Sequence, residues 1–278
     1  MNIAESYRYC SSMARSQAKN FYTSFLFLPR EKRNAISSVY AFMRACDDIT
    51  DNGQSNEFRK KSLHQWKEKV KKFLEEGDLN HPIFPSLQDT IHQFKIPHSY
   101  FYEILEGVQM DLEPIRFSRF TELYPYCYKV ASVVGLICLY IFRFKEASTL
   151  EHGEACGIAF QLTNILRDLK EDAEMGRIYL PQEDMTKFKY SENDLIHFKI
   201  NENFIALMKF ESERAESFYQ KAAVLPERID PDSQRAIKVM IGIYHGILKK
   251  IQAKNYDVLS ERIRLSFWEK VKIVISNL

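Results

Sequence analysis

Two short acidic segments hold the side chains in this sequence that are best suited to chemistry. The first, RACDDITD, contains Asp47, Asp48 and Asp51, and the second, RDLKED, contains Asp168 and Asp172. Each begins with an arginine and follows a largely apolar stretch. Carboxylates are seldom buried among apolar residues unless something pairs with them. The two segments therefore predict sites for a cation or a cationic ligand.

Helical spacing gathers each set of acids on a polar face, because residues four apart lie on the same side of an α-helix. On the first segment the shared face holds Tyr40, Arg44, Asp47 and Asp51, and on the second it holds Gly157, Gln161, Asn164, Asp168 and Asp172. We expect the two faces to line one cavity from opposite sides.

Several carboxylates facing one cavity favour a hard divalent cation, since they repel each other unless cations neutralise them. Magnesium is commonly held by a few carboxylates and substrate phosphate, whereas zinc prefers His and paired Cys ligands, which are missing nearby. Arg44 and Arg167 can grip phosphate oxygens. The expected ligand is a diphosphate bridged by Mg²⁺, with Mn²⁺ as the alternative ion. Capping or solvated acids are the other interpretation, because a single D-x-x-x-D pattern on a helix is common.

The composition limits the class of protein. The 278 residues carry 39 basic and 37 acidic side chains, so no global field favours nucleic acid. The five cysteines form no C-x-x-C pair and the N-terminus has no apolar signal core, as is typical of a reduced, cytoplasmic protein. The most apolar run, residues 130–142, is shorter than the roughly 20 residues of a membrane span and predicts a buried core helix.

Apolar residues recur at three-to-four spacing along most of the chain, and strand alternation is hard to find. Residues 58–77, for example, place Leu63, Trp66, Val70 and Phe73 on one helical face. Further helices are predicted over residues 31–51, 121–141, 151–172, 201–225 and 233–255. No low-complexity tract separates them. We therefore predict one all-α domain over residues 1–278.

Three longer segments resemble a known family. FYTSFLFLPREKRNAISSVYAFMRACDDITD, YCYKVASVVG and GIAFQLTNILRDLKEDAEMGRIYLP resemble, in order, the N-terminal, middle and second aspartate blocks of the squalene/phytoene synthase family. The resemblance implies the isoprenoid synthase fold, with helices around a central cavity. It also implies an enzyme that joins two allylic prenyl diphosphates head to head.

The resemblance also implies roles for single residues. Asp47, Asp48, Asp51, Asp168 and Asp172 would hold magnesium and diphosphate, and Arg44, Gln161, Asn164 and Arg167 would grip the diphosphates. Tyr126 would take part in proton removal, while Asp111 and Tyr256 match an acid and a late tyrosine of the substrate site. Phe21, Phe25, Tyr40 and Phe160 could stabilise a passing cation, with Val130, Val134 and Leu162 as tunnel wall; ordinary core packing is the alternative for each apolar residue. Gly135 and Gly157 could let backbones approach closely.

The amino-acid sequence of these segments most resembles bacterial members of the hopanoid branch of the family. Those members make presqualene diphosphate from farnesyl diphosphate. Phe25 resembles a bulky floor that limits chain length. We expect the reaction to stop at presqualene diphosphate without NADPH. The alternatives are a phytoene synthase that uses geranylgeranyl diphosphate, a squalene synthase if NADPH is used, and a non-catalytic scaffold relative. Ala18, Asn20 and Ser132 depart from the pattern of many relatives, which leaves substrate details open.

The C-terminal stretch ERIRLSFWEKVKIVI mixes basic residues with Leu265, Phe267, Trp268, Val271 and Ile275. We expect a last helix that closes the fold, with Arg262, Arg264 or Lys270 near phosphate. The alternative is a peripheral contact with a membrane surface. The expected location is therefore the cytoplasm, including the inner face of the membrane, and the sequence leaves the oligomeric state open.

Overall fold

The computed structural model describes residues 1–50, 55–113 and 115–277, apart from the side chains of residues 19–21 and 50. In these residues the regular elements are helices, with one isolated bridge between Phe144 and Ile229. The chain divides into two compact units, each built from three stretches of sequence. Unit 1 comprises Met1–Glu113, Leu136–Ala147 and Pro226–Ile237, and unit 2 comprises Pro114–Gly135, Ser148–Leu225 and Lys238–Leu278.

Unit 1 is organised around the long helix that ends in the first acidic segment. Its helices are α1 (Ile3–Gln17), α2 (Lys19–Phe25), α3 (Arg30–Thr50), α4 (Asn56–Glu76), α5 (Phe84–Phe94) and α6 (Ser99–Met110). Helices α1, α4, α5 and α6 all pack against α3. Most of α3 is therefore surrounded by other helices, which fixes the direction in which its acidic end leaves the core.

The predicted apolar face of α4 is confirmed, because Leu63, Trp66, Val70 and Phe73 are all buried. The Trp66 ring stacks on Phe84 of α5 at a centroid distance of 5.7 Å. Its indole Nε1 donates a hydrogen bond to Cys46 Sγ at 3.3 Å. Cys46 directly precedes the first acids, so this contact anchors the last turns of α3.

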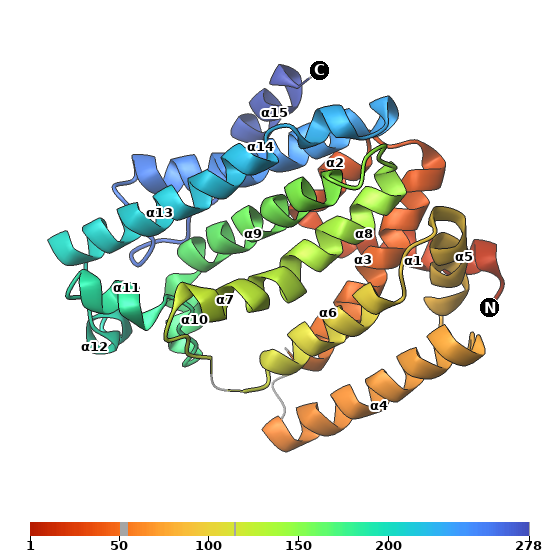
Figure 1. The fold of residues 1–278 in the computed structure, drawn as a ribbon, viewed down its shortest axis with the longest axis horizontal. Helices are drawn as coiled ribbons and strands as arrows, with labels where there is room; N and C mark the ends of the chain where they lie inside the picture. Colours follow the sequence, from red (N-terminus) through yellow and green to blue (C-terminus); the bar gives the residue numbers. More distant parts are fainter. Residues whose placement is uncertain (51–54, 114, 278) are drawn as a thin grey trace. The chain divides into compact units, whose positions relative to one another are not determined.

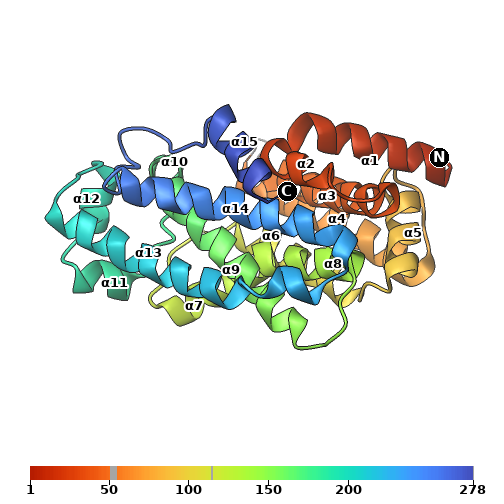
Figure 2. The same cartoon turned by 90° about the horizontal axis from the view of Figure 1, so that it is seen from above.

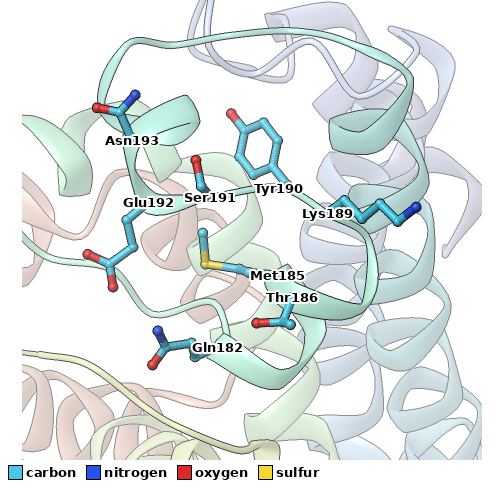
Figure 3. A pocket seen from close by; sticks show the side chains of 8 residues that line it. All are labelled: Gln182, Met185, Thr186, Lys189, Tyr190, Ser191, Glu192 and Asn193. Atoms are coloured by element: carbon cyan, nitrogen blue, oxygen red, sulfur yellow. The ribbon is translucent and has the colours of Figure 1, made fainter.

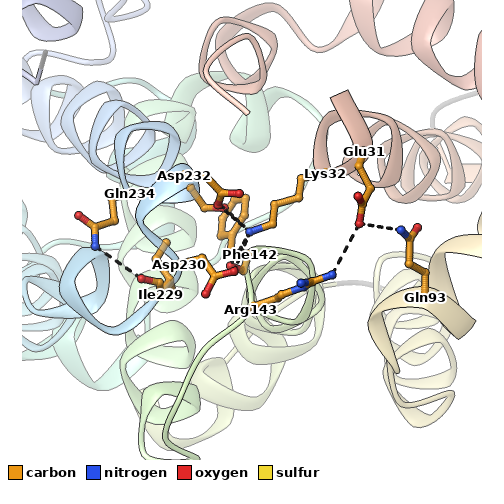
Figure 4. A network of polar contacts seen from close by, with 10 residues as sticks. Glu31, Lys32, Gln93, Phe142, Arg143, Ile229, Asp230, Asp232 and Gln234 are labelled. Atoms are coloured by element: carbon orange, nitrogen blue, oxygen red, sulfur yellow. Dashed lines mark hydrogen bonds and ion pairs between the residues drawn. The ribbon is translucent and has the colours of Figure 1, made fainter. Parts of the chain in front are cut away.

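A buried lysine links the three stretches of unit 1 (Figure 4). The Lys32 ammonium donates to the carbonyl oxygen of Phe142 at 3.1 Å and to Asp232 Oδ1 at 2.6 Å. It also donates to Asp230 at 3.2 Å and to Ser233 Oγ at 3.1 Å. Each donor of the ammonium thus meets an oxygen, which is what allows a charge to be buried. Lys32 therefore holds the two later segments of unit 1, Leu136–Ala147 and Pro226–Ile237, against its first segment.

Unit 2 holds the second acidic segment. Its elements are α7 (Phe120–Cys127), a π-helical turn η1 (Tyr128–Ser132), α9 (Thr149–Arg167), α10 (Leu169–Glu174), α11 (Gln182–Lys187), α12 (Glu192–Ile196), α13 (Glu202–Ala222) and α15 (Phe267–Ser276). Helix α8 (Val133–Phe142), the 3₁₀ turn η2 (Leu225–Arg228) and α14 (Pro231–Ala253) pass between the units. Helix α9 packs along α13, and the two run side by side in Figure 1 and Figure 2.

The prediction of one helix over residues 151–172 was wrong in one respect. Helix α9 ends at Arg167, and Asp168 has φ −102° and ψ 12°, outside the helical range. A second helix, α10, begins at the next residue. The amides of Asp168 and Asp172 still donate to carbonyls four residues back, each at 2.9 Å. The break is therefore a local kink that re-aims Asp172 relative to α9.

A buried ionic cluster ties α13 to α11 within unit 2. Arg214 Nη1 lies 2.8 Å from Asp184 Oδ2 and 2.7 Å from Glu211 Oε2. The Arg214 guanidinium also lies over the rings of Phe120 and Phe210, at 4.3 and 4.9 Å from their centroids. Burial raises the pKa of Glu211 to about 8, although Arg214 acts to lower it. Arg214 is thus the cation on which two buried carboxylates depend.

One described helical run, Phe120–Phe142, is long and apolar enough to cross a membrane by length and composition. Half of its most apolar window is buried within the protein. Core helices of globular proteins have the same length and composition, so this run alone is weak evidence for a span.

Candidate active site

The first acidic motif lies at the end of α3 in unit 1. Tyr40 and Arg44 are half-buried, whereas Asp47 and Asp48 are exposed. Arg44 Nη2 lies 2.5 Å from Asp48 Oδ1, one helical turn ahead. Burial raises the pKa of Tyr40, with a lowering effect from Arg44 and raising effects from the two acids. Tyr40, Arg44 and Asp47 of the predicted face therefore lie in the last turns of α3, Asp51 lies outside the described residues, and a joint role of these side chains stays a prediction.

The second acidic motif, in unit 2, is held by two arginines. Arg167 Nε donates to Asp168 Oδ1 at 2.8 Å, and its Nη2 contacts the other carboxylate oxygen. Arg262 Nη2 lies 2.9 Å from Asp168 Oδ1, and its Nη1 lies 2.8 Å from Glu171 Oε2. Two guanidinium groups therefore contact the Asp168 carboxylate, and charge-assisted hydrogen bonds of this kind are strong. Arg262 sits on the connection before α15, and sequence reasoning named it only as one of three basic residues.

A buried oxygen without a partner lies beside this motif. Asn164 Oδ1 is buried and accepts no hydrogen bond, while Asn164 Nδ2 donates to Gln161 Oε1 at 3.4 Å. Buried polar atoms are rarely left unsatisfied in native proteins, so such an atom calls for a missing partner. Asn164 lies one turn before Asp168, and amide and carboxylate oxygens are the ligands that Mg²⁺ prefers. The donor set at this end of α9 therefore fits a hard cation.

No group of three His, Cys, Asp or Glu side chains converges on a metal position within the described ranges, which omit residues 51–54. The acids of the two motifs belong to different units. The magnesium site shared by both motifs therefore stays a prediction.

Tyr126 of α7 lies in an aromatic cluster of unit 2. Its hydroxyl donates to the hydroxyl of Tyr179 at 3.3 Å, and the two rings stack with centroids 5.3 Å apart. The ring of Phe117 lies 5.6 Å from that of Tyr126. The hydrogen bond leaves the Tyr126 oxygen with lone pairs that can accept a proton. Tyr179 is a partner that the sequence did not reveal, because it lies 53 residues further along.

A close backbone contact fixes the π-helical turn that follows Tyr126. A Cβ atom at Gly157 of α9 would lie 2.3 Å from Ser132 Cα and 2.6 Å from Ser132 N. Ser132 Oγ donates to the carbonyl oxygen of Glu154 at 2.8 Å. The sequence interpretation of Gly157 as a close-approach residue is confirmed. Turns of this kind occur frequently at functional sites.

Replacing Gly157 with Ala should therefore lower the free energy of unfolding by about 1–3 kcal/mol, because the new atom overlaps backbone that cannot swing aside. Urea unfolding measures this change. Gly135→Ala is the matched control, since its Cβ would meet only the carbonyl oxygen of Gly153 at an ordinary 3.6 Å. Equal losses in both variants would contradict a special role for the Gly157 contact.

The remaining predicted residues are distributed over both units. Phe25 is buried and meets Tyr22 edge to face, with centroids 6.4 Å apart, while the side chain of Phe21 is outside the described part. Asp111 is half-buried at the end of α6. In unit 2, Phe160 stacks on Tyr244 at 4.3 Å. Three wall candidates, Val130, Val134 and Leu162, are half-buried or buried.

Burial raises the pKa of two tyrosines of unit 2, Tyr256 and Tyr244. Tyr256 follows α14 with a left-handed φ of 63°, and burial raises its pKa, with a smaller contribution from Glu213. The described contacts therefore place Tyr256 near Glu213. Tyr244, which sequence reasoning missed, is electrostatically coupled to Arg167 and Asp168, and burial raises its pKa to about 12. A tyrosine in an apolar helical stripe gives no sequence signal that distinguishes it from core.

The clearest surface groove does not contain the predicted residues. It has a volume of about 570 Å³ and lies within unit 2, between α11 and α12 (Figure 3). Its lining consists of Gln182, Met185, Thr186, Lys189, Tyr190, Ser191, Glu192 and Asn193. None of these belongs to an acidic motif, so this groove gives no support to the predicted substrate site.

Comparison with known proteins gives the family. The family described as squalene/phytoene synthase matches residues 14–269. The chain belongs to the squalene/phytoene synthase family. It is 33% identical over 282 residues to the 15-cis-phytoene synthase of Synechococcus elongatus, covering 97% of this chain and 91% of that protein. It is 32% identical over 286 residues to the phytoene synthase of Mycobacterium tuberculosis, with coverages of 99% and 91%.

Solved structures show the same fold. A dehydrosqualene synthase in complex with ligand matches with a TM-score of 0.91 at 29% identity, covering 99% of this chain and 96% of that one. Squalene synthase HpnC from Alicyclobacillus acidocaldarius matches with a TM-score of 0.84 at 27% identity, covering 90% and 94%. The predictions of an all-α isoprenoid synthase fold and of this family are confirmed. The squalene/phytoene synthase family joins prenyl diphosphates head to head, and the chain is an enzyme of this type.

Proposed function

We propose that this chain condenses two farnesyl diphosphates into presqualene diphosphate, with release of one diphosphate. The observation that carries the choice of substrate is Phe25, a bulky side chain only 3% exposed at the position that resembles a chain-length floor. Two of the similar solved structures are those of a dehydrosqualene synthase and a squalene synthase. Both observations favour the shorter prenyl chain.

The polar ends of α3 and α9 would bind the diphosphate groups. Arg44 and Arg167 would each place a guanidinium against phosphate oxygens, where charge-assisted hydrogen bonds are strong. Asp47, Asp48, Asp51, Asp168, Asp172 and the free Asn164 oxygen would hold Mg²⁺ or Mn²⁺. The bound cation would supply charge neutralisation for the departing diphosphate. Arg262, now on Asp168, would be displaced toward the anionic ligand when the cation binds.

The reaction breaks one C–O bond and one C–H bond, converts one C=C double bond into a single bond, and forms two C–C bonds. The C–O bond of the first farnesyl diphosphate breaks, and its electron pair leaves with the diphosphate. The double bond of the second substrate attacks the allylic cation, and loss of a proton closes the cyclopropane ring. Tyr126, whose hydroxyl is hydrogen-bonded to Tyr179, would help to orient the removal of that proton, and the released diphosphate would be its final acceptor. Buried aromatic rings such as Phe160 would exclude water and stabilise the cation.

The second candidate function is a phytoene synthase that uses geranylgeranyl diphosphate. It is favoured by the names of the curated relatives, at 33% and 32% identity. A squalene synthase that consumes NADPH and a non-catalytic scaffold relative are further alternatives. A non-catalytic relative would be expected to lose carboxylates of the two motifs. All five predicted acids are present in the sequence, and four of them lie in the described residues, which disfavours a scaffold.

Product analysis tests this proposal. The purified chain is incubated with Mg²⁺ and either farnesyl or geranylgeranyl diphosphate, with and without NADPH, and the lipids are identified by mass spectrometry. We expect presqualene diphosphate from farnesyl diphosphate, unchanged by NADPH. A C40 product from geranylgeranyl diphosphate alone would establish the phytoene alternative, squalene with NADPH would establish the reductive one, and inactivity with both substrates would support the scaffold.

A further inference from the structure

The last helix of unit 2, α15, has two different faces. None of its residues is buried, although six of its ten residues are apolar or aromatic. The four polar ones are Glu269, Lys270, Lys272 and Ser276. Such a helix is unusual at the surface of a globular protein, because apolar residues of a packed helix normally face the core. The distribution of these residues around the helix shows what each face does.

The inward face of α15 packs on two glycines of α14. A Cβ atom at Gly242 would lie 2.7 Å from Ile273 Cγ2, and one at Gly246 would lie 3.2 Å from Ile273 Cδ1. Glu269 Oε2 lies 2.7 Å from Lys250 Nζ of α14 and forms an ion pair with it. The same oxygen accepts a hydrogen bond from the amide of Ser266, which caps the helix. These contacts hold α15 on α14 and fix the direction of its opposite face.

The outward face is apolar and edged by lysines. At 100° per residue its apolar members are Phe267, Trp268, Val271 and Ile275. Phe267 is 70% exposed, Trp268 75% and Ile275 61%, the first two being the most exposed large apolar residues of the described chain. Lys270 and Lys272 flank this stripe on its two sides. Lysines in this position can extend their charged ends toward lipid headgroups while their stems stay apolar.

The charge around this face is positive. Glu269, the acid within α15, is paired with Lys250, and Glu261 before the helix is paired with Lys254 at 3.1 Å. Arg264 and Lys272 are exposed. An exposed aromatic stripe with basic edges is the pattern of helices that lie in the headgroup region of an anionic bilayer, where tryptophan is favoured.

We propose that the outward face of α15 docks the protein on anionic lipid bilayers. Phe267, Trp268 and Ile275 enter the headgroup–acyl boundary, and Arg264, Lys270 and Lys272 meet the acidic lipids. This surface is independent of which prenyl diphosphate the enzyme uses, so the proposal stands or falls separately from the proposed function. It gives a specific location to the peripheral membrane contact that was the alternative interpretation of the C-terminal stretch.

Vesicle flotation tests the proposal with the full chain. We expect binding to vesicles of phosphatidylcholine with phosphatidylglycerol, and binding at least about tenfold weaker to phosphatidylcholine alone. The double variant Phe267→Ser/Ile275→Ser should lose binding to the anionic vesicles. Phe58→Ser on α4 is the matched control, since Phe58 is 50% exposed but lies in unit 1, and it should bind like the wild type.

Tryptophan fluorescence gives a second, local measurement. The chain has two tryptophans, of which Trp66 is 7% exposed and Trp268 is 75% exposed. In a Trp66→Phe chain the emission reports Trp268 alone and should shift to the blue on addition of anionic vesicles. No shift, equal binding to neutral vesicles, or unchanged flotation of the double variant would overturn the proposal. So would a dimer in sedimentation that the double variant dissociates, because the face would then bind a second copy.

Discussion

Replacing Asp168 with Asn should lower kcat by about 10²–10³-fold while leaving the fold intact. The asparagine keeps the shape of the side chain but removes the charge that Arg167 and Arg262 now contact. That charge is one of the predicted ligands for the cation that neutralises the departing diphosphate, and groups of this kind typically contribute this much to rate. Release of diphosphate from farnesyl diphosphate with Mg²⁺ measures the effect.

Glu174→Gln is the matched control for this substitution. Glu174 is exposed at the end of α10, close in sequence to Asp172, and its replacement removes the same charge. It should leave kcat within about twofold, since surface substitutions away from a site have small effects. If Asp168→Asn retained the activity of Glu174→Gln, the second acidic motif would not be part of the active site.

Replacing Arg214 with Ala should lower the free energy of unfolding by about 3–5 kcal/mol. The side chains of Asp184 and Glu211 are only 6% and 3% exposed, and Arg214 is the cation in ion-pair contact with both. Without Arg214 the charge of Asp184 is uncompensated in a low-dielectric interior, which is strongly destabilising, and Glu211, whose pKa is raised to about 8, loses a hydrogen-bond donor. Urea unfolding followed by circular dichroism measures the loss.

Lys187→Ala serves as the control, because Lys187 Nζ also lies over the Phe210 ring, at 4.0 Å, but at the surface. It should cost no more than about 1 kcal/mol. The same cluster makes stability depend on pH. Since burial raises the pKa of Glu211 from 4.5 to about 8, the folded chain holds this proton more tightly than the unfolded chain.

The stabilising contribution of the Glu211 proton is therefore complete below pH 4.5 and is lost as the pH rises through 8. Glu211→Gln should remove this part of the pH dependence. An Arg214→Ala variant no less stable than Lys187→Ala, or a pH dependence unchanged by Glu211→Gln, would show that the cluster does not control the stability of unit 2.

Most of the helices could be predicted from the repeating spacing of apolar residues in the sequence. Leu63 and Trp66 could be placed on a buried face because a helical stripe depends on residue type and spacing alone. The kink at Asp168 could not, since it is a change of backbone angles at one residue that leaves the spacing unaltered. The π-helical turn at Tyr128–Ser132 could not be predicted for the same reason.

The candidate site was predictable where its residues are neighbours in sequence. Arg44 and Asp48 could be paired because they are one helical turn apart. The contact of Arg262 with Asp168 and that of Tyr126 with Tyr179 depend on tertiary packing, which no local pattern encodes. The close approach at Gly157 could be predicted, because a glycine within an apolar helix often allows such a contact.

The proposed active site requires that the two acidic motifs bind one metal–diphosphate group together. A crystal structure with Mg²⁺ and an unreactive farnesyl thiodiphosphate tests it most directly. We expect carboxylates from both the Asp47–Asp51 and the Asp168–Asp172 segments at about 2.1 Å from metal ions that share the same diphosphate. A diphosphate bound away from either segment, or metal ions held by only one of them, would contradict the claim.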